Sequence, residues 1–331
     1  MATKTVLVTG TSAGGIGSAL AFAFQKRGLR VFATARNTSK IDPALADLPN
    51  VELLSLDVTS DASIAAAVAE VKERAGGKLD FLVNNSGLGY IMPFLDLDMD
   101  EAKKLFDVNF WGVLAATKAF APMLIEAKGA IVNISSISAV AYNPYESRFF
   151  RDSRFPLPTF FGGGFFLQTS PFQIPSNPSA RKGRGCCAVL ITFLVIYNSS
   201  KAAITMFSDT LRMELAPMGV KVVTVMTGMV KTNWYNNLPT FILPSDSLYL
   251  PVVKHIEAGA TGVDNAKSGT PVNVYAESVV KHLLGGANGR IWHGAMSTLV
   301  WSLSLLPYSV MVSGFVFLDH ELKTDWEYRI M

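Results

Sequence analysis

The sequence predicts an α/β fold in which a doubly wound parallel sheet carries helices on both faces. Two observations predict it. Short apolar, β-branched runs alternate with segments of helical composition as far as residue 230, and the first run leads into a glycine-rich loop that opens a helix. Strands that alternate with helices form a parallel sheet covered on both sides. In this chain of 331 residues, we expect one domain over residues 1–290 and an apolar extension over 291–331.

The first strand is predicted at residues 5–9, where Thr-Val-Leu-Val-Thr is typical of a buried parallel strand. The loop TGTSAGGIG follows at Thr9–Gly17, and Ser18–Arg27 has helical composition up to Gly28. This order is the fingerprint of a Rossmann-type dinucleotide site, because glycines let the backbone approach a pyrophosphate and the helix N-terminus offers it free N–H groups. An ordinary glycine-rich turn is the alternative.

The second predicted strand, Arg30–Thr34, bears on which dinucleotide would bind. In folds that bind NAD, an acidic side chain near the end of this strand accepts the ribose hydroxyls. No Asp or Glu occurs from Ser18 to Ile41, whereas Arg36 and Lys40 are present. A guanidinium group suits a 2′-phosphate, so the sequence favours NADP(H). A solvated surface arginine would leave the same pattern.

Tyr197 and Lys201 form the second chemical signal. Four positions apart on a helix, they would share one face. A free tyrosine has a pKa of about 10, too high for proton transfer near neutrality, and a nearby cation lowers that pKa towards the working range. Plain amphipathic helices often contain the same pair, so its weight depends on the motifs upstream.

Further motifs stand in order along the chain. They are Asp57 in LDV, Asn84 in NNSG after the predicted strand 81–83, Asn109 in VNFWG, Ser136 at the end of IVNISS, and Thr232 in TGMVKT. Together they resemble the motifs of the short-chain dehydrogenase/reductase family over most of the chain. Three segments, ATARN, LDVTS and GRIWHGA, are similar in sequence to those of fungal 1-acyldihydroxyacetone phosphate reductase-like members.

The resemblance implies roles for individual residues. The catalytic residues would be Ser136, Tyr197, Lys201 and Asn109. The cofactor would be held by Gly10, Thr11, Gly15, Ile16, Gly17, Arg36, Asp57, Asn84, Tyr197, Lys201, Val230 and Thr232. No metal is implied.

The implied reaction is hydride transfer between NADP(H) and a carbonyl or alcohol group. Ser136 would polarise the substrate carbonyl and Tyr197 would donate the proton as general acid. By the same resemblance, Lys201 would lower the pKa of Tyr197 and hold the nicotinamide ribose, and Asn109 would keep a water that returns the proton from solvent. Two alternatives stay open, namely a cofactor-binding protein without catalysis and a lipid-binding module at a membrane surface.

Two small departures from the family pattern lie near the expected site. The glycine loop is one residue longer, so Gly10, Gly15 and Gly17 are the expected equivalents and Gly14 is the extra residue. Thr227 stands in place of the customary proline, and we expect the loop after it to be looser.

A larger departure is an apparent insertion at Arg148–Val195, because Ser136 and Tyr197 lie much closer together in the family. This segment holds both cysteines, and it carries six basic residues against one acidic residue, Asp152. Three readings compete: a lid or wall at the substrate site, a contact with a membrane or partner, and sequence that the functional protein lacks, such as a retained intron. The third is favoured, because composition changes at both ends and the family spacing returns when the segment is removed. If it is present and ordered, the segment could impair catalysis.

The substrate lobe is expected at Trp234–Tyr275, which the motifs do not constrain. Apolar residues gather at its start, namely Trp234, Tyr235, Phe241, Ile242 and Leu243. They suggest a bulky hydrophobic ketone, a lipid or a secondary metabolite, although packing in a core would explain the same residues.

Composition excludes several other classes of function. The net charge of +3 comes from the apparent insertion, and no basic stripe elsewhere supports nucleic-acid binding. Two adjacent cysteines and four scattered histidines form neither a disulfide framework nor a metal site. The first strand begins by Thr5, which leaves no room for a signal peptide.

The uncharged stretch Gly294–Leu318 could meet a membrane. Its length would permit a span, whereas Pro307 and five serines suit two short amphipathic helices, on a membrane surface or packed over the substrate pocket. The family resemblance therefore places the protein in the cytoplasm or at the surface of the endoplasmic reticulum or a lipid droplet. It also implies a homo-oligomer.

Overall fold

Residues 3–140 and 194–305 are described in the computed structural model of this chain. The predicted insertion at Arg148–Val195 lies outside the described residues except for Leu194 and Val195. The second half of the apolar stretch 294–318, with Pro307, also lies outside them.

Seven parallel strands form the central sheet, in the order β3-β2-β1-β4-β5-β6-β9. The chain runs from β1 outwards to β3, returns to β4 beside β1, and continues outwards to β9. This is the doubly wound arrangement that the sequence predicts. The strands are β1 (Thr5–Val8), β2 (Arg30–Ala35), β3 (Val51–Ser55), β4 (Phe81–Asn84), β5 (Ala130–Ile134), β6 (Lys221–Thr227) and β9 (Gly289–His293).

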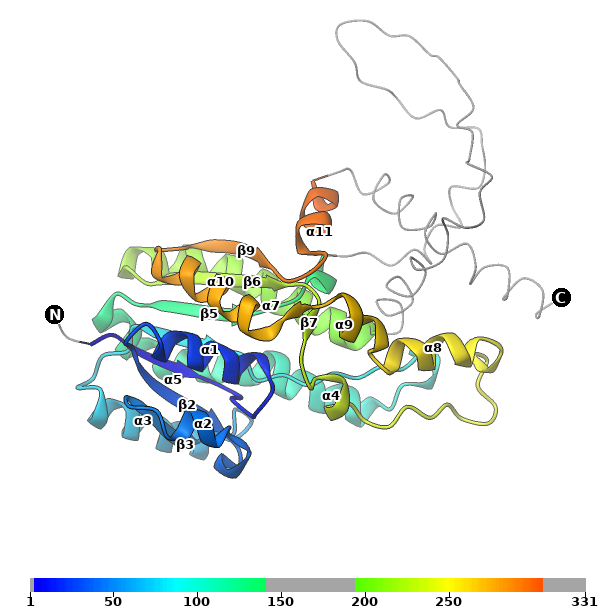
Figure 1. Cartoon of the computed structure of the whole chain (residues 1–331), viewed down its shortest axis with the longest axis horizontal. Helices are drawn as coiled ribbons and strands as arrows, with labels where there is room; N and C mark the ends of the chain where they lie inside the picture. The colour runs from blue at the N-terminus through cyan, green and yellow to red at the C-terminus, as the bar shows by residue number, and fades with distance from the viewer. Residues whose placement is uncertain (1–2, 141–193, 306–331) are drawn as a thin grey trace, which may run out of the picture.

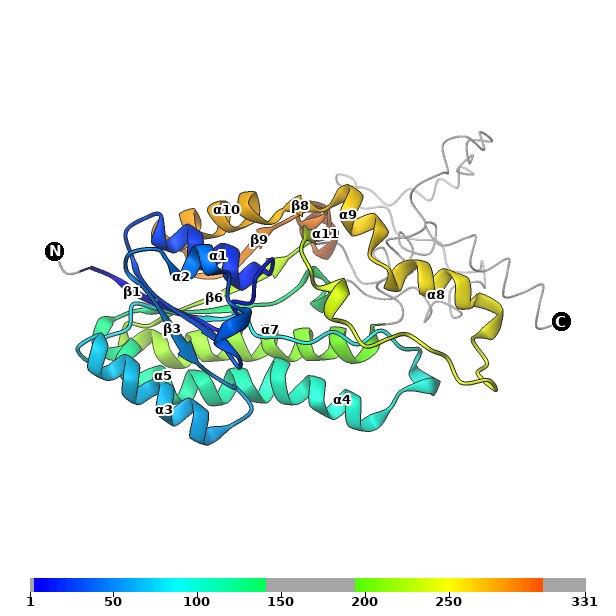
Figure 2. The same cartoon turned by 60° about the horizontal axis from the view of Figure 1, so that its bottom comes forward.

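Helices cover both faces of this sheet (Figures 1 and 2). On one face α1 and α10 lie against each other, and α3, α5 and α7 lie on the other. The alternation along β1 shows why two layers form, since Val6 and Val8 belong to the first core and Leu7 to the second. These helices are α1 (Ile16–Gln25), α3 (Asp61–Arg74), α5 (Gly112–Ala127), α7 (Val195–Leu215) and α10 (Val272–Leu284).

The remaining elements are short. A second, two-stranded sheet pairs β7 (Val230–Lys231) with β8 (Thr270–Pro271) in parallel. The short helices are α2 (Pro43–Ala46), α4 (Met99–Phe106), α8 (Val253–Ala260), α9 (Val263–Ser268) and α11 (Ser297–Ser304). Single turns occur at Thr38–Lys40, Phe94–Asp96, Ile137–Ala139, Ala216–Met218, Tyr235–Asn237 and Leu250–Val252.

The early strands lie where the sequence predicts them, with ends that differ by one residue. β9 carries the sheet as far as His293 and pairs with β6, so the sheet continues past the domain boundary expected at residue 290. One domain accounts for every described strand of the main sheet.

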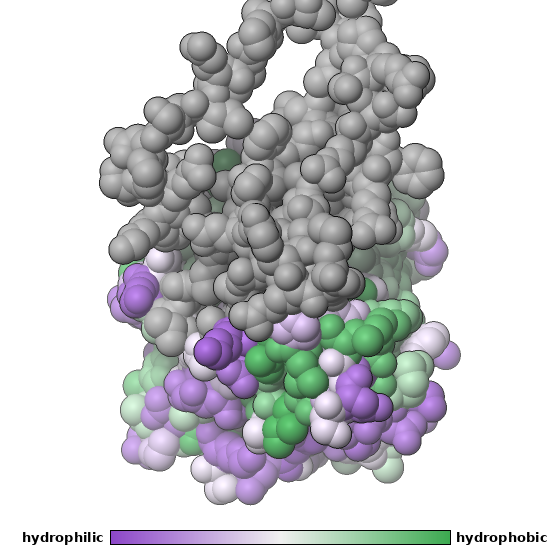
Figure 3. Space-filling model, turned by 90° about the vertical axis from the view of Figure 1, so that its right-hand side faces the viewer, coloured by the Kyte–Doolittle hydropathy of each residue, from purple (hydrophilic) through white to green (hydrophobic). Residues whose placement is uncertain are grey.

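Loops and short helices beyond the carboxyl ends of the strands form one end of the molecule, around α4 and α8 (Figure 1). Viewed from that end, apolar surface lies beside polar surface (Figure 3). Phe94, Leu95, Ile242 and Leu248 of these loops are exposed.

α11 lies in the described part of the apolar stretch 294–318, residues 294–305. Val300 packs against Ile137 and Trp292, while Leu299 and Trp301 face outwards. The helix therefore contacts the sheet end through one side only.

One helical stretch in the described ranges, residues 99–127, is long and apolar enough to cross a membrane by length and composition. In the fold, 44% of its apolar window is buried, and Phe120 and Leu124 belong to the core beneath the sheet. Packing inside the protein accounts for part of its apolar character.

Candidate active site

The predicted catalytic serine and tyrosine lie together although they are far apart in the sequence. Ser136 lies two residues after the end of β5. Tyr197 and Lys201 lie one turn apart near the start of α7. The Tyr197 hydroxyl is hydrogen-bonded to Ser136. The Lys201 ammonium donates to the carbonyl oxygen of Ile134 at 2.8 Å and lies 5.7 Å from the centre of the Tyr197 ring. Hydroxyl, phenol and ammonium therefore share one site.

Burial governs the protonation of this site. Burial raises the pKa of Tyr197 to about 12, and the hydrogen bond from Ser136 counters part of that rise. Burial lowers the pKa of Lys201 to about 8. The expected lowering of the tyrosine pKa is thus not found, because the removal of the phenolate from water has the largest effect on it.

Ser136 is held by the turn that follows it. Its Oγ accepts hydrogen bonds from the backbone N–H of Ser138 at 3.1 Å and from the Ser138 hydroxyl at 2.9 Å. The neighbouring hydroxyl of Ser135 is buried and bonds Thr205 at 2.7 Å. Ser136, which is only half-buried, is therefore the serine available to a substrate.

Asn109 lies in a widened helical turn, the π-helix η3 (Asp107–Trp111), between α4 and α5. Its side chain donates to the Leu88 carbonyl at 2.9 Å and accepts from the Leu88 N–H at 2.7 Å. It also donates to Ser200 on α7 at 3.1 Å. Asn109 thereby joins η3 to the helix that carries Tyr197, and a π turn of this kind is frequent at functional sites.

The glycine loop has the conformation that the fingerprint requires. Gly10 has φ +71°, and a Cβ on Gly17 would lie 2.4 Å from the carbonyl oxygen of Gly10. Gly15 precedes the first residue of α1, Ile16; this helix start has no side-chain cap and no acidic residue in its first turn. Free N–H groups beside closely approaching backbone suit a pyrophosphate. Thr11 is buried and donates from its hydroxyl to the Thr34 carbonyl at 3.1 Å.

The second asparagine of NNSG, which the sequence reading missed, holds this loop. Asn85 donates from its side chain to the carbonyl oxygens of Thr9 at 2.8 Å and Gly10 at 2.9 Å. Its own N–H donates to the Thr9 hydroxyl at 2.9 Å. The side chain of Asn84 instead points into the core and bonds Thr117 and Asn133. Only its place beside Asn84 in the motif could have drawn attention to Asn85.

Arg36 and Asp57 lie together at the ends of β2 and β3. Burial raises the pKa of Asp57, but hydrogen bonds from Thr59 and the charge of Arg36 outweigh this and hold it below its ordinary value. Arg36 is exposed, and within the described ranges no salt bridge is recorded for it. The glycine loop reaches the same corner, since the N–H of Ala13 donates to the Lys40 carbonyl at 2.9 Å.

The segment that starts at Thr227, where we expect a looser loop, is joined to other elements by hydrogen bonds. The Thr227 hydroxyl bonds the buried Tyr275 hydroxyl at 2.7 Å, so a hydrogen bond replaces the rigidity of a proline. The N–H of Gly228 donates to the His293 carbonyl at 2.7 Å. The segment then continues into β7 with Val230 buried, and the Thr232 hydroxyl accepts from the N–H of Trp234 at 3.3 Å.

Apolar side chains surround Tyr197 on the side away from the sheet. Two clusters share its ring, and their members come from the loop after β4 and from the expected substrate lobe. They include Leu88, Tyr90, Ile91, Met92, Trp234, Leu238, Phe241, Leu243, Val252 and Ile256. Of the five apolar residues named from the sequence, Trp234, Phe241 and Leu243 lie here. Tyr235 makes an edge-to-face contact with Trp234, with ring centres 4.9 Å apart, and Ile242 is exposed.

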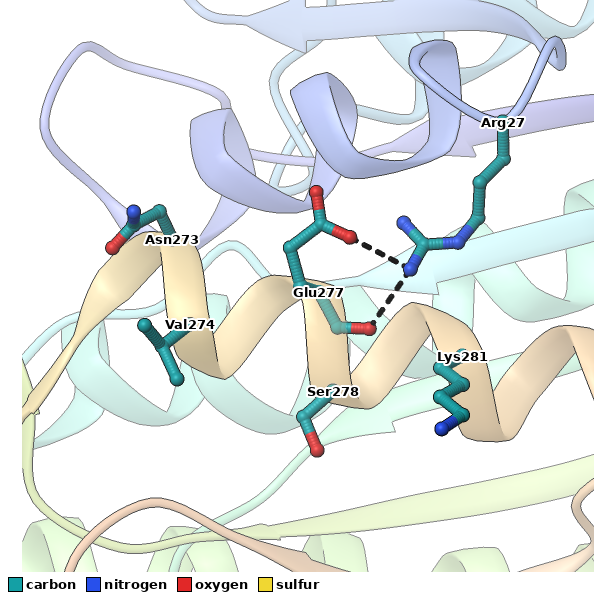
Figure 4. A pocket seen from close by; sticks show the side chains of 6 residues that line it. All are labelled: Arg27, Asn273, Val274, Glu277, Ser278 and Lys281. Atoms are coloured by element: carbon teal, nitrogen blue, oxygen red, sulfur yellow. Dashed lines mark hydrogen bonds and ion pairs between the residues drawn. The ribbon is translucent and has the colours of Figure 1, made fainter.

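Two other features have no part in this site. No group of three or more His, Cys, Asp or Glu side chains among the described residues could hold a metal. An open surface pocket of about 410 Å³ lies between α1 and α10, on the other face of the sheet from α7 (Figure 4). Arg27 spans it and donates to the carboxylate and the carbonyl oxygen of Glu277 at 2.7 and 3.2 Å. The pocket is thus bridged by an ion pair that joins two helices.

The sequence of this chain matches known proteins over most of its length. A family model described as short chain dehydrogenase matches residues 4–148 and 187–241, and the residues left out between them fall within the predicted insertion. The short-chain dehydrogenase PC-15 of Penicillium crustosum is 40% identical over 308 residues, which cover 93% of this chain and 94% of that protein. The NADPH-dependent 1-acyldihydroxyacetone phosphate reductase of Schizosaccharomyces pombe is 32% identical over 324 residues, which cover 93% and 92%.

Solved structures share the fold. A short-chain dehydrogenase from Streptomyces avermitilis has a TM-score of 0.65 at 24% identity, and the match covers 99% of this chain and 97% of that one. A short-chain dehydrogenase from Burkholderia cenocepacia in complex with NADP has a TM-score of 0.63 at 22% identity, over 95% and 97%.

Proposed function

Because the chain belongs to the short-chain dehydrogenase family, we propose that it is an NADPH-dependent reductase of a bulky apolar ketone. One observation carries the proposal: the Tyr197 hydroxyl is hydrogen-bonded to Ser136, with the Lys201 ammonium 5.7 Å from the tyrosine ring. A general acid and a second hydroxyl at this spacing can both reach one carbonyl oxygen.

The roles of the residues follow from their positions. Ser136 hydrogen-bonds the substrate carbonyl oxygen and polarises it, and Tyr197 gives its proton to the oxygen as negative charge develops there. Lys201, with a pKa of about 8, is charged near neutrality and stabilises the phenolate that results. Bound NADPH supplies the hydride. Asn109 fixes η3 against α7 through Ser200 and so keeps Tyr197 in place.

NADP(H) rather than NAD(H) is supported by Arg36, an exposed guanidinium at the end of β2 with the glycine loop beside it. The curated relative from Schizosaccharomyces pombe is NADPH-dependent by name. We expect Arg36→Asp to weaken NADPH binding by about 10- to 100-fold, the value of charge-assisted hydrogen bonds to a 2′-phosphate. NADH affinity should hardly change, which fluorescence titration of both cofactors would show. Equal losses for the two cofactors would contradict the assignment, and Lys118→Ala, at an exposed lysine of α5, is the control.

The substrate class is supported by the walls of the site. Apolar and aromatic side chains of two hydrophobic clusters gather around the Tyr197 ring, and they favour a ketone with a large hydrocarbon part. Fungal short-chain dehydrogenases and an acyl-lipid phosphate reductase are both among the relatives. A lipid and a secondary metabolite are the two substrate classes that follow.

Replacement of Tyr197 by Phe tests the proposal. We expect NADPH oxidation with any accepted ketone to fall by about 100-fold or more, because the general acid is lost. NADPH affinity should survive, and Tyr249→Phe, which removes a hydroxyl from the same apolar cluster, should retain turnover. Unchanged turnover in the Tyr197→Phe variant would rule out the mechanism. NADPH binding without turnover on a broad panel of ketones would favour a non-catalytic cofactor-binding protein.

A further inference from the structure

The indole of Trp234 stands beside the catalytic phenol. Its ring centre lies 5.6 Å from that of Tyr197 with the planes at 62°. Tyr235 meets the same indole from another side, 4.9 Å away at 89°. Both are edge-to-face contacts, the arrangement that aromatic rings prefer. Any group attached to a carbonyl at Tyr197 therefore comes close to Trp234.

Gly89 provides the room that the indole occupies. A Cβ on Gly89 would lie 2.2 Å from Cζ2 of Trp234 and 2.5 Å from a methyl carbon of Leu238. The backbone of Gly89 does not have a positive φ, so space rather than conformation requires a glycine here. The indole thus rests directly on the backbone of the loop after β4 and cannot move towards it.

The backbone at Trp234 is held by hydrogen bonds to Thr232 and, through Asn233, to the glycine loop. Its N–H donates to the Thr232 hydroxyl at 3.3 Å. The N–H of the preceding residue, Asn233, donates to the carbonyl oxygen of Gly14 at 3.3 Å. Gly14 has φ +72°, and a Cβ there would lie 2.2 Å from the side-chain nitrogen Nδ2 of Asn233. The residue that makes the glycine loop one longer therefore also sets the position of the aromatic wall.

We propose that Trp234 determines which ketones the enzyme accepts, in favour of substrates with a flat polycyclic group next to the carbonyl. This inference rests on the function proposed above. The indole is held by Gly89, Tyr197 and Tyr235, so it acts as a rigid wall rather than a movable gate. A flat ring system gains contact with such a wall, whereas a small ketone gains little. Contacts of this size discriminate substrates by about 10- to 200-fold.

The test compares two probe ketones, 2-acetylnaphthalene and cyclohexanone, in NADPH-dependent reduction. Their ratio of kcat/KM values should fall at least about 10-fold in Trp234→Ala. Ile242→Ala is the matched control, because Ile242 is an apolar residue of the same segment that is 71% exposed. It should leave the ratio unchanged. A ratio that stays the same in Trp234→Ala would overturn the inference.

A rescue experiment distinguishes an effect of the indole's position from a general loss of activity. Gly89→Ala should lower kcat/KM for both ketones, because the new methyl group displaces the indole. Adding Trp234→Leu removes the clash with the indole and leaves only the contact with the end of the Leu238 side chain, which can rotate away. The double variant should regain reduction of cyclohexanone but not the preference for 2-acetylnaphthalene. Failure of the rescue in a folded double variant would overturn the inference while the proposed function stands. Failure of the wild-type protein to reduce either ketone while it binds NADPH would overturn the proposed function and this inference with it.

Discussion

Lys201 is a residue whose burial serves the reaction and costs stability. It is 7% exposed, and burial lowers its pKa from 10.5 to about 8. Between these two values the unfolded chain holds a proton that the folded protein has lost. The free energy of unfolding should therefore rise as the pH increases from about 8 to 10.5, and below pH 8 the folded state bears the full cost of a buried ammonium group.

The variant Lys201→Met tests whether the buried ammonium group supports activity at the expense of stability. Without the buried charge, the free energy of unfolding at pH 7 should increase by about 1–3 kcal/mol, while NADPH-dependent turnover is lost. Urea unfolding and an activity assay on the same preparation would measure both effects. Lys118→Met, at an exposed lysine of α5, is the control and should change neither. A less stable Lys201→Met protein would show that the hydrogen bond to Ile134 outweighs the burial of charge.

At this scale the motif residues could be predicted, but their environment could not. The spacing of Tyr197 and Lys201 and the family pattern indicated that they meet Ser136, and the structure places the three together. The direction of the tyrosine pKa shift depends on how completely neighbouring loops exclude water, which no local motif records. Asn84 and Asn85 show the same limit, because adjacent residues of a strand end point to opposite sides.

Among the elements, η3 could not have been foreseen. The motif VNFWG is placed on a helix by the family resemblance, and nothing in its residues indicates a wider turn. The extra residue in the turn at Asp107–Trp111 turns Asn109 towards Leu88 and Ser200, with which it forms three hydrogen bonds. Only these partners, which lie on other elements, explain why the wider turn is stable.

The segment after β6 shows a substitution compensated by a distant element. Loss of the proline at position 227 suggests a looser loop, because a proline restricts its own φ. The compensating hydroxyl belongs to Tyr275 on α10, 2.7 Å away. Burial raises the pKa of Tyr275 above its ordinary value, so this hydroxyl stays protonated. The sequence alone does not predict this pair, because Thr227 and Tyr275 come together only when α10 packs against the end of β6.

For the molecule as a whole, the two described ranges on either side of the apparent insertion contribute to one site. Ser136 and Tyr197 meet, and α7 begins at Val195 with Leu194 buried against Ile91 and Val252. Removal of residues 148–193 should therefore give a folded protein with the cofactor affinity and turnover of the full chain. Circular dichroism, NADPH titration and the ketone assay would check this. A folded but inactive shortened chain would make the segment part of the substrate site.

A second deletion sharpens that comparison. Removal of Arg148–Val195, the range suggested by the sequence, also takes away Leu194, which is 3% exposed. This variant should be less stable than the one that retains Leu194 by about 2 kcal/mol, the value of burying one leucine side chain. Equal stability of the two variants would mean that another residue fills the place of Leu194.

The overall architecture was the most predictable level. Alternating strands and helices and a glycine loop sufficed for the parallel doubly wound sheet, because each strand buries both faces and needs helices on each side. The end of the molecule around α4 and α8 was not predictable in detail. Its apolar residues show no regular period, so the sequence could not separate those that pack around Tyr197 from those that are exposed, such as Ile242.

The reacting groups come from opposite halves of the polypeptide. The glycine loop, Arg36 and Ser136 precede residue 140, whereas the phenol and the ammonium group follow residue 194. Cleavage of any peptide bond between those two points would give two fragments. The N-terminal fragment would carry the glycine loop without the general acid, and the C-terminal fragment would carry the general acid without the glycine loop. Neither fragment could reduce a ketone by itself, and activity would return only when the two fragments associate again.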